Sequence, residues 1–153
     1  MDDNRRFRIV SYNLHRFNQG KILLSSLCAS HDFVFVQEHW LALYDLDKLN
    51  TVTYNMVCFG SSAMNEVVSR DCLSGRPFGG VAVYVKQCFA ASTKLVSSSK
   101  RYIILIVGQL LLINVYLPCI STANCEDEYI VCLSSIMNDI SELQFPDIIY
   151  GVK

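Results

Sequence analysis

The chain has 153 residues, of which 52% are hydrophobic and only 18% are charged. This length corresponds to one domain. The formal net charge of −1 excludes a global basic field for nucleic acid, so any such contact must come from local Arg and Lys side chains. The mean hydropathy of +0.29 has two explanations, a membrane span or a core-rich part of a larger domain.

The sequence contains seven cysteines, and no two of them form a Cys-x-x-Cys motif. Residues 1–8, MDDNRRFR, are charged and lack the apolar segment of a secretory signal. These features favour reduced, mostly buried thiols in a nuclear or cytoplasmic protein. A zinc site formed by Cys119, Cys125 and Cys132 is an alternative, although their spacing fits no standard pattern.

The first predicted elements form a strand, helix and strand. Residues 7–12 are a β-branched and aromatic run that predicts a strand. The apolar spacing of residues 21–29 predicts a helix that begins near Gly20 and ends by His31. The apolar run at residues 33–36 predicts the next strand, over residues 32–38. This order and the short crossover indicate that the two strands are neighbours in one sheet.

The rest of the chain is predicted to consist mainly of strands. The expected strands are residues 54–59, 81–85, 88–96, 102–107, 110–117 and 147–150. Residues 41–49 predict a short helix. Residues 124–143 predict a longer one, whose acidic first residues suit a helix N-terminus. The polar connection 60–77 is long, which is typical of functional or mobile loops.

Residues 102–117 are the only candidate for a membrane span. This run has 16 residues and is interrupted by Gly108, Gln109 and Asn114. A spanning helix needs about 20 mostly apolar residues. Because the run is also rich in Ile and Val and has Gly108-Gln109 in its middle, a β-hairpin is the better interpretation.

Glu38 lies at the end of a buried apolar strand, in the sequence FVFVQEHW at residues 33–40. Burial disfavours a charged carboxylate and raises its pKa by roughly 3–5 units when it is complete. A hydrogen-bond network, a cationic side chain or a metal ion should therefore compensate Glu38. The alternative is that Glu38 reaches solvent where the strand ends.

Other polar residues also lie at the ends of predicted strands, namely Asn13 and, within INVYLP at residues 113–118, Asn114 and Tyr116. If the strands are neighbours, their ends converge on one rim of the sheets. An amide, a carboxylate and a phenol suit the binding of a hydrated Mg²⁺ and a phosphate. The alternatives are that Asn13 simply ends a strand as a turn former and that Tyr116 is an ordinary sheet residue with its hydroxyl at the surface.

The three histidines, His15, His31 and His39, do not show the spacing of metal ligands. A structural role is favoured for all three, although His15 lies in the loop after Asn13 and could approach a phosphate. The sequence has no Gly-x-Ser-x-Gly motif, P-loop or paired Cys/His arrangement.

Five short motifs occur together in an order and spacing that resembles the endonuclease/exonuclease/phosphatase superfamily. They are SYN at 11–13, VQEHWL at 36–41, GRPFGGVAV at 75–83, INVYLP at 113–118 and IIYG at 148–151. QEHWL and RPFGGVA most resemble the apurinic/apyrimidinic endonuclease-like domain at the start of non-LTR retrotransposon polyproteins. The resemblance covers nearly the whole chain.

The resemblance implies an α/β (α+β) fold, a four-layer α/β/β/α sandwich of two mixed sheets. It also implies Mg²⁺-dependent hydrolysis of phosphodiester bonds in DNA, with Mn²⁺ as an alternative metal. The expected partners are DNA and a downstream reverse transcriptase region, and no membrane. In such a site the metal acts as a Lewis acid on a phosphoryl oxygen.

The resemblance also assigns roles to individual residues. Asn13 and Glu38 match the family's metal and water site, and Tyr116 matches its phosphate-contacting tyrosine; these three are the expected catalytic residues. The weaker candidates for contacts with phosphate or DNA are Asn114, His15 and Arg76.

Two family motifs have no match in this sequence. The family continues Asp-Phe-Asn after IIYG, whereas here Gly151 is followed by Val152 and Lys153, and the later Ser-Asp-His signature is also absent. General acid–base help is worth about 10²–10⁴-fold in rate, so we expect little turnover. Residues 1–153 are therefore expected to form a single, incomplete domain, truncated at its C-terminus. The missing part explains the high hydropathy better than a membrane span does.

Two other functions remain alternatives. The chain could be a non-catalytic remnant or an interaction fragment, which the missing motifs favour. It could also be a phosphatase of the same superfamily that acts on lipid or inositol phosphates. The retroelement-like QEHWL and RPFGGVA argue against the phosphatase.

Overall fold

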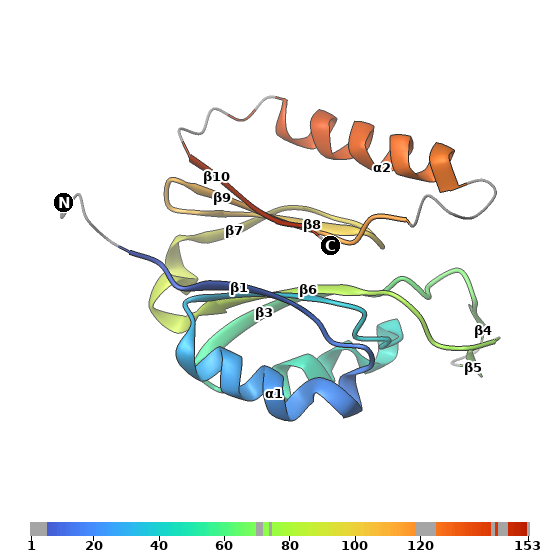
Figure 1. Ribbon diagram of the computed structural model, residues 1–153, viewed down its shortest axis with the longest axis horizontal. Coiled ribbons are helices and arrows are strands. Elements are labelled where there is room, and N and C mark those ends of the chain that lie inside the picture. Colours follow the sequence, from blue (N-terminus) through green and yellow to red (C-terminus); the bar gives the residue numbers. More distant parts are fainter. Residues whose placement is uncertain are drawn as a thin grey trace.

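The computed structural model describes residues 6–69, 72–73, 75–118, 125–141, 143 and 147–152. Two β-sheets face each other, and helices cover the outer face of each sheet (Figure 1). This arrangement confirms the predicted α/β class and the four-layer α/β/β/α sandwich. A separate two-stranded hairpin lies at one end of the molecule (Figure 1).

The first sheet has four strands in the order β1-β2-β6-β3. Their bounds are β1 Ile9–Asn13, β2 Phe33–Gln37, β6 Val81–Lys86 and β3 Met56–Ser61. β1 and β2 are parallel neighbours, as their spacing in the sequence predicts. β6 runs antiparallel to both β2 and β3, which makes the sheet mixed.

The second sheet is also mixed and has the order β10-β9-β8-β7. Its strands are β10 Asp147–Val152, β9 Leu110–Val115, β8 Tyr102–Val107 and β7 Thr93–Ser98. β10 is parallel to β9, whereas β9, β8 and β7 alternate in direction. β8 and β9 form the predicted hairpin, so the alternative of a membrane span over residues 102–117 is wrong. In the part of the chain that the structure describes, no helix has the length and apolar character needed to cross a membrane.

Two α-helices and two 3₁₀-helices complete these layers, and several of their bounds differ from the prediction. They are α1 Phe17–Ser30, η1 Leu43–Thr51, η2 Gln87–Ser92 and α2 Cys125–Ile140. α1 begins three residues before Gly20, because the Arg16 carbonyl already accepts the Gly20 N–H at 3.2 Å and Phe17 is buried. The predicted strand 88–96 is wrong over its first half, which is η2. There the hydroxyls of Ser92 and Thr93 bond the Phe89 carbonyl.

A short hairpin forms inside the long connection that was predicted as a loop. Its strands are β4 Val68–Ser69 and β5 Cys72–Leu73, which pair antiparallel. Each strand has only two residues, too few to produce a period-two pattern that a sequence reading could detect.

The β2 residues are buried on both faces of the sheet. Phe33 and Phe35 point into the layer between the two sheets, where they pack with residues of β6, β8 and β9. Val34 and Val36 point the other way, into the layer under α1. Burial on both faces explains why this strand is a continuous apolar run rather than an alternating one.

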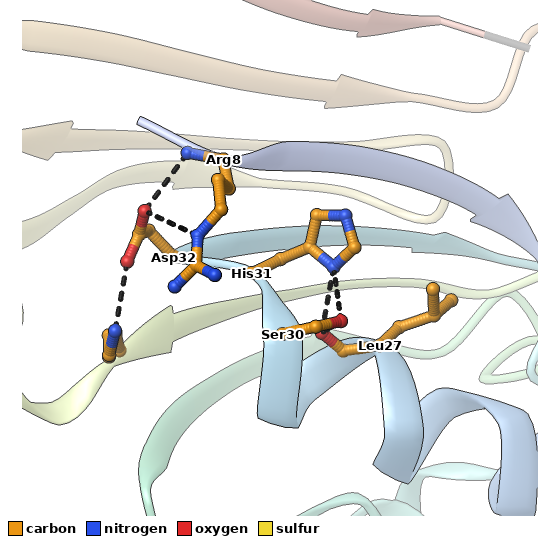
Figure 2. A network of polar contacts seen from close by, with 6 residues as sticks. Arg8, Leu27, Ser30, His31 and Asp32 are labelled. Carbon is orange, nitrogen blue, oxygen red and sulfur yellow. Dashed lines mark hydrogen bonds and ion pairs between the residues drawn. The ribbon is translucent and has the colours of Figure 1, made fainter. Parts of the chain in front are cut away.

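Charged residues join three strand ends at the start of β2. The Asp32 carboxylate accepts the Arg8 N–H at 2.9 Å and lies 3.0 Å from Lys86 Nζ. Figure 2 shows Asp32 against Arg8, with His31 bonded back to the last turn of α1 through Leu27. Because Arg8 precedes β1 and Lys86 ends β6, this cluster fixes the end of the sheet opposite to Glu38.

Candidate active site

The structure brings four of the predicted site residues together at the rim where β1, β2 and β9 end. Asn13 is the last residue of β1 and is the register partner of Gln37, so Glu38 follows directly beside it. Tyr116 follows β9 on the opposite sheet and donates its hydroxyl hydrogen to Glu38 Oε1. His15 Nδ1 lies 3.2 Å from Glu38 Oε2.

Glu38 is only 15% exposed, and both of its carboxylate oxygens have a polar neighbour. The compensation expected for this residue is therefore present, as one phenol and one imidazole. Asn13 completes the cluster, because its Oδ1 accepts the backbone N–H of His15 at 3.1 Å. The same hydrogen bond closes a turn at the end of β1. Asn13 therefore also has the turn-forming role that was the alternative to a role in the site.

The backbone after β1 and β2 adopts positive φ angles at residues that are not glycine. The values are 50° at His15, 98° at Arg16, 57° at Glu38 and 57° at Trp40. Each such residue costs about 1–3 kcal/mol, and such residues cluster at functional sites. Glu38 and three residues of the segments beside it have such angles, which indicates a site whose geometry the surrounding structure imposes.

Hydrogen bonds from neighbouring segments hold these strained residues in place. The Glu38 N–H donates to the Gly80 carbonyl at 2.8 Å, and the Trp40 N–H donates to the Gly79 carbonyl at 3.0 Å. On the other side, the Arg16 N–H donates to the Glu38 carbonyl at 2.9 Å. The motif glycines before β6 thus support the backbone of Glu38 directly.

His39 has the structural role that was predicted for it. The residue is fully buried, its Nε2 bonds the Ser61 carbonyl at 3.0 Å, and its Nδ1 accepts the Leu41 N–H at 3.0 Å. Burial lowers the pKa of His39 to about 4, although hydrogen bonds to the Ser61 and Val81 backbone oppose the shift. The ring is therefore neutral at pH 7, and it holds the segment after Glu38 against β3.

Asn114 lies deeper than a contact with phosphate requires. It is fully buried, and its Nδ2 donates to the carbonyls of Val36 at 2.9 Å and Ala82 at 2.8 Å. Its Oδ1 accepts from Gln37 Nε2 at 2.7 Å. Its amide therefore links the two sheets, which does not fit the expected contact with phosphate or DNA. The strand-end pattern located Asn114 correctly along the chain, but it did not give the side chain's depth.

Gln37 is a buried polar residue next to Glu38 that the sequence analysis did not single out as a candidate. It is fully buried, and its Nε2 donates to Ser11 Oγ at 3.0 Å as well as to Asn114. The available signal was a polar residue in the last position of an apolar strand, because a buried amide requires partners.

Arg76 is exposed and lies in the segment before β6, and among the described residues its side chain does not contact Glu38. Its predicted contact with DNA stays a prediction. For the zinc alternative, Cys125 and Cys132 lie on α2 and Cys119 lies outside the described residues. Within the described part of the chain, no cluster of three or more His, Cys, Asp and Glu residues could hold a metal ion.

Among the described residues of this cluster, the Glu38 carboxylate and the Asn13 amide oxygen are the groups that could bind a metal ion. Mg²⁺ is commonly bound by one or two carboxylates, with waters and substrate phosphate completing its shell. Glu38 and Asn13 fit that donor set, since both offer oxygen and lie on adjacent strand ends. Protein residues would supply only part of the shell, so we expect this pair alone to bind Mg²⁺ weakly.

A polar groove lies further along the same rim, between the end of β3 and the β7–β8 connection. Its volume is about 420 Å³, and its lining includes Ser61, Ser62, Ser99 and Lys100. β7 and β9 both run antiparallel to β8, so they end at the same side of the sandwich. The groove and the Glu38 cluster therefore face the same side.

The chain shares its fold with several solved structures. The chain is similar to an AP endonuclease from Archaeoglobus fulgidus, with 13% identity, a TM-score of 0.65 and coverage of 96% of this chain and 56% of that one. It is similar to a variant of the 3′ phosphatase NExo from Neisseria bound to a product DNA hairpin, with 14% identity, a TM-score of 0.66 and coverage of 96% and 57%. It is also similar to D. rerio TDP2 complexed with single-strand DNA product, with 19% identity, a TM-score of 0.59 and coverage of 97% and 60%.

The chain therefore has the same fold as these structures, which agrees with the fold expected from the sequence motifs. The chain spans 56% to 60% of the length of these three structures. Neither a protein-family model nor a curated protein matches the sequence.

Proposed function

We propose that this chain belongs to a Mg²⁺-dependent phosphodiester hydrolase that cleaves DNA, the endonuclease of a non-LTR retroelement. The observation that carries the proposal is the cluster at the strand-end rim, where Glu38 lies between Tyr116 and His15 and beside Asn13. A carboxylate with phosphate-binding groups around it suits phosphoryl chemistry, in which catalysis is mostly positioning and stabilisation of charge.

Each residue of the cluster has a role in this proposal. Glu38 and Asn13 would hold the metal ion with their side-chain oxygens. When bound, the ion acts as a Lewis acid on a phosphoryl oxygen. The Tyr116 hydroxyl and the His15 ring lie beside the carboxylate, where they can donate hydrogen bonds to the oxygens of the same phosphate.

DNA is the proposed substrate because of the neighbours and the local charges. Two of the similar structures hold DNA products, a hairpin and a single strand. On this chain the rim carries Lys100 in the polar groove and Arg101, whose guanidinium lies 6.0 Å from the centre of the Tyr116 ring. These local cations provide phosphate contacts that the net charge of −1 does not.

We further propose that residues 1–153 form the first part of a longer domain that precedes a reverse transcriptase. The support for the longer domain is the coverage, because the chain matches 96% of its own length but only 56% of the AP endonuclease. QEHWL at residues 37–41 and RPFGGVA at residues 76–82 support the retroelement origin. Because the family's acid–base residues are not in this sequence, we expect slow turnover.

Nicking of a supercoiled plasmid tests the proposal. The full chain should nick slowly with Mg²⁺ or Mn²⁺, and Glu38→Gln should lower the rate by about 10²-fold or more, because the metal loses its carboxylate. Glu126→Gln is the matched control, because Glu126 is exposed on α2 and does not line the polar groove, so this change should leave the rate unchanged. Nicking that persists in EDTA or in Glu38→Gln would contradict the metal role.

The same preparations distinguish the alternatives. Absence of nicking, together with Mn²⁺ binding that Glu38→Gln does not weaken, would favour the non-catalytic remnant. An oligonucleotide with a 3′-phosphate is a second substrate, because one of the similar structures is a 3′ phosphatase. Release of phosphate without strand cleavage would assign the site to a phosphatase.

A further inference from the structure

We infer that Asn114 and Gln37 are positioning residues that set the spacing between Glu38 and Tyr116. The inference rests on the proposed function, since it concerns the geometry of that site. Glu38 and Tyr116 lie on different sheets, so their contact depends on how the two sheets are placed relative to each other. Asn114 and Gln37 form the buried polar link between those sheets.

The link is complete in hydrogen bonds. Asn114 Nδ2 donates to the carbonyls of Val36 and Ala82, at 2.9 Å and 2.8 Å, and so bridges two adjacent strands of the opposite sheet. Its Oδ1 accepts from Gln37 Nε2 at 2.7 Å. Gln37 Nε2 also bonds Ser11 Oγ at 3.0 Å, which extends the network to β1.

Each strand that carries a site residue joins this network two residues earlier. Ser11 lies two residues before Asn13 on β1, Val36 lies two residues before Glu38, which follows β2, and Asn114 lies two residues before Tyr116, which follows β9. Val36 joins the network through its backbone carbonyl, because its side chain points into the layer under α1. The link from Asn114 to the Val36 carbonyl is followed along the chain by the link from Tyr116 to the Glu38 carboxylate, as successive rungs between the sheets.

A polar link has an effect here that an apolar contact lacks. The rest of the layer between the sheets is apolar, with Phe35, Val83 and Leu112 among its members. Apolar contacts are non-directional and tolerate sliding, whereas hydrogen bonds lose strength when distance or angle changes. A misplacement of about 1 Å can cost about 10²-fold in rate, so fixing the sheets matters for the site.

Asn114→Leu removes the link while keeping a side chain of similar size. We expect kcat for plasmid nicking to fall by about tenfold or more, with KM changed by less than about twofold, because the site is misplaced rather than emptied. The matched control is Leu112→Ala, which changes a fully buried side chain two residues earlier in the same layer. This control should lose stability but keep kcat within about twofold at temperatures where it is folded.

The double variant Gln37→Leu/Asn114→Leu separates positioning from stability. Replacing both partners of a buried hydrogen bond with apolar groups can be nearly neutral for stability, whereas removing one partner is costly. We therefore expect the double variant to regain much of the Tm that Asn114→Leu loses without regaining kcat. A purely structural role predicts that Tm and kcat recover together, and that result would overturn the inference.

A spectroscopic readout tests the geometry without turnover. With ¹³Cζ-labelled tyrosine, the resonance of Tyr116 is assigned by its loss in Tyr116→Phe, and it reports the hydrogen bond to Glu38. It should move towards the position of a solvated tyrosine in Asn114→Leu and stay in place in Leu112→Ala. An unchanged resonance in Asn114→Leu would overturn the inference, while loss of nicking alone would concern only the proposed function.

Discussion

Gly80 is the residue at which the backbone beside the site has the least room. Its φ is +87°, and a Cβ atom at this position would lie 2.3 Å from His39 Cε1. The His39 ring cannot move aside easily, because it is fully buried and bonded to the Ser61 carbonyl and the Leu41 N–H. Since the Gly80 carbonyl accepts the Glu38 N–H, a shift here also moves the carboxylate.

We therefore expect Gly80→Ala to lower the free energy of unfolding by about 2–4 kcal/mol, through backbone strain and overpacking together. Gly108→Ala is the control, because Gly108 has a φ of +60° but has nothing within 4 Å of a Cβ atom. It should cost only the strain, about 1–2 kcal/mol. Urea denaturation of both variants measures the difference, and equal losses would show that His39 gives way.

The sequence identified the positions of the candidate site residues along the chain, but it did not predict how deeply each side chain is buried. Asn13, Glu38 and Tyr116 became candidates because polar residues lie at the ends of apolar strands and because they match family motifs, and the structure brings the three together. Asn114 shares the same pattern and lies inside the sandwich instead. The alternation of residues along one strand predicts which face of the sheet each side chain points to. Its burial depends also on the other sheet, which the local sequence does not describe.

At the scale of the elements, Asp32 is the charged residue that connects the ends of three strands. Its side chain is 13% exposed, and it is the common partner of Arg8 and Lys86, which belong to the ends of two other strands. Burial raises the pKa of Asp32, but the Arg8 N–H, the Lys86 hydrogen bond and both positive charges outweigh it, so the pKa lies below 3.8.

The sign of the pH dependence follows from this lowered pKa. A carboxyl whose pKa is lower in the folded state adds stability above its unfolded pKa and loses it as the pH falls through the folded value. We expect Asp32→Asn to cost about 1–3 kcal/mol at pH 7 and less at pH 3, because the wild-type chain loses this stabilisation as its own carboxylate becomes protonated.

Denaturation in urea at the two pH values measures this difference. Asp45→Asn is the control, because Asp45 pairs with Lys48 at the surface, where such pairs contribute about 0–1 kcal/mol. A cost for Asp32→Asn that is the same at pH 7 and pH 3 would contradict the assignment.

The elements were predicted best where apolar residues form long runs. The strands β2, β6, β8 and β9 follow such runs, and the structure has them close to the predicted bounds. The 3₁₀-helix η2 was predicted as a strand. Its buried residue is Phe89, and a phenylalanine that packs in the core is found in strands and in tight helical turns alike. There the backbone followed local hydroxyl bonds to the Phe89 carbonyl, which override strand propensity.

At the scale of the whole molecule, the site exists only because two sheets are stacked. β1 and β2 supply Asn13 and Glu38 from one sheet, and β9 supplies Tyr116 from the other. The motifs predicted this sandwich through the resemblance to a superfamily, since β-strand patterns alone do not specify which sheet a strand joins. A ligand that binds at the rim therefore binds only the folded state.

Metal binding should for this reason stabilise the entire fold. A ligand that binds only the folded state adds RT ln(1 + [L]/Kd) to the free energy of unfolding, which is about 2.7 kcal/mol at 100 times Kd. If Glu38 and Asn13 hold the ion, the Tm of the full chain should rise with the concentration of Mg²⁺ or Mn²⁺ and should stop rising in Glu38→Gln. NaCl of equal ionic strength corrects for screening, and Glu126→Gln should behave as the wild type, because that side chain is exposed on α2. If the Tm of Glu38→Gln rises as much as that of the wild type, the metal binds elsewhere on the chain. That result would contradict the proposal that the rim cluster is the metal site of a hydrolase.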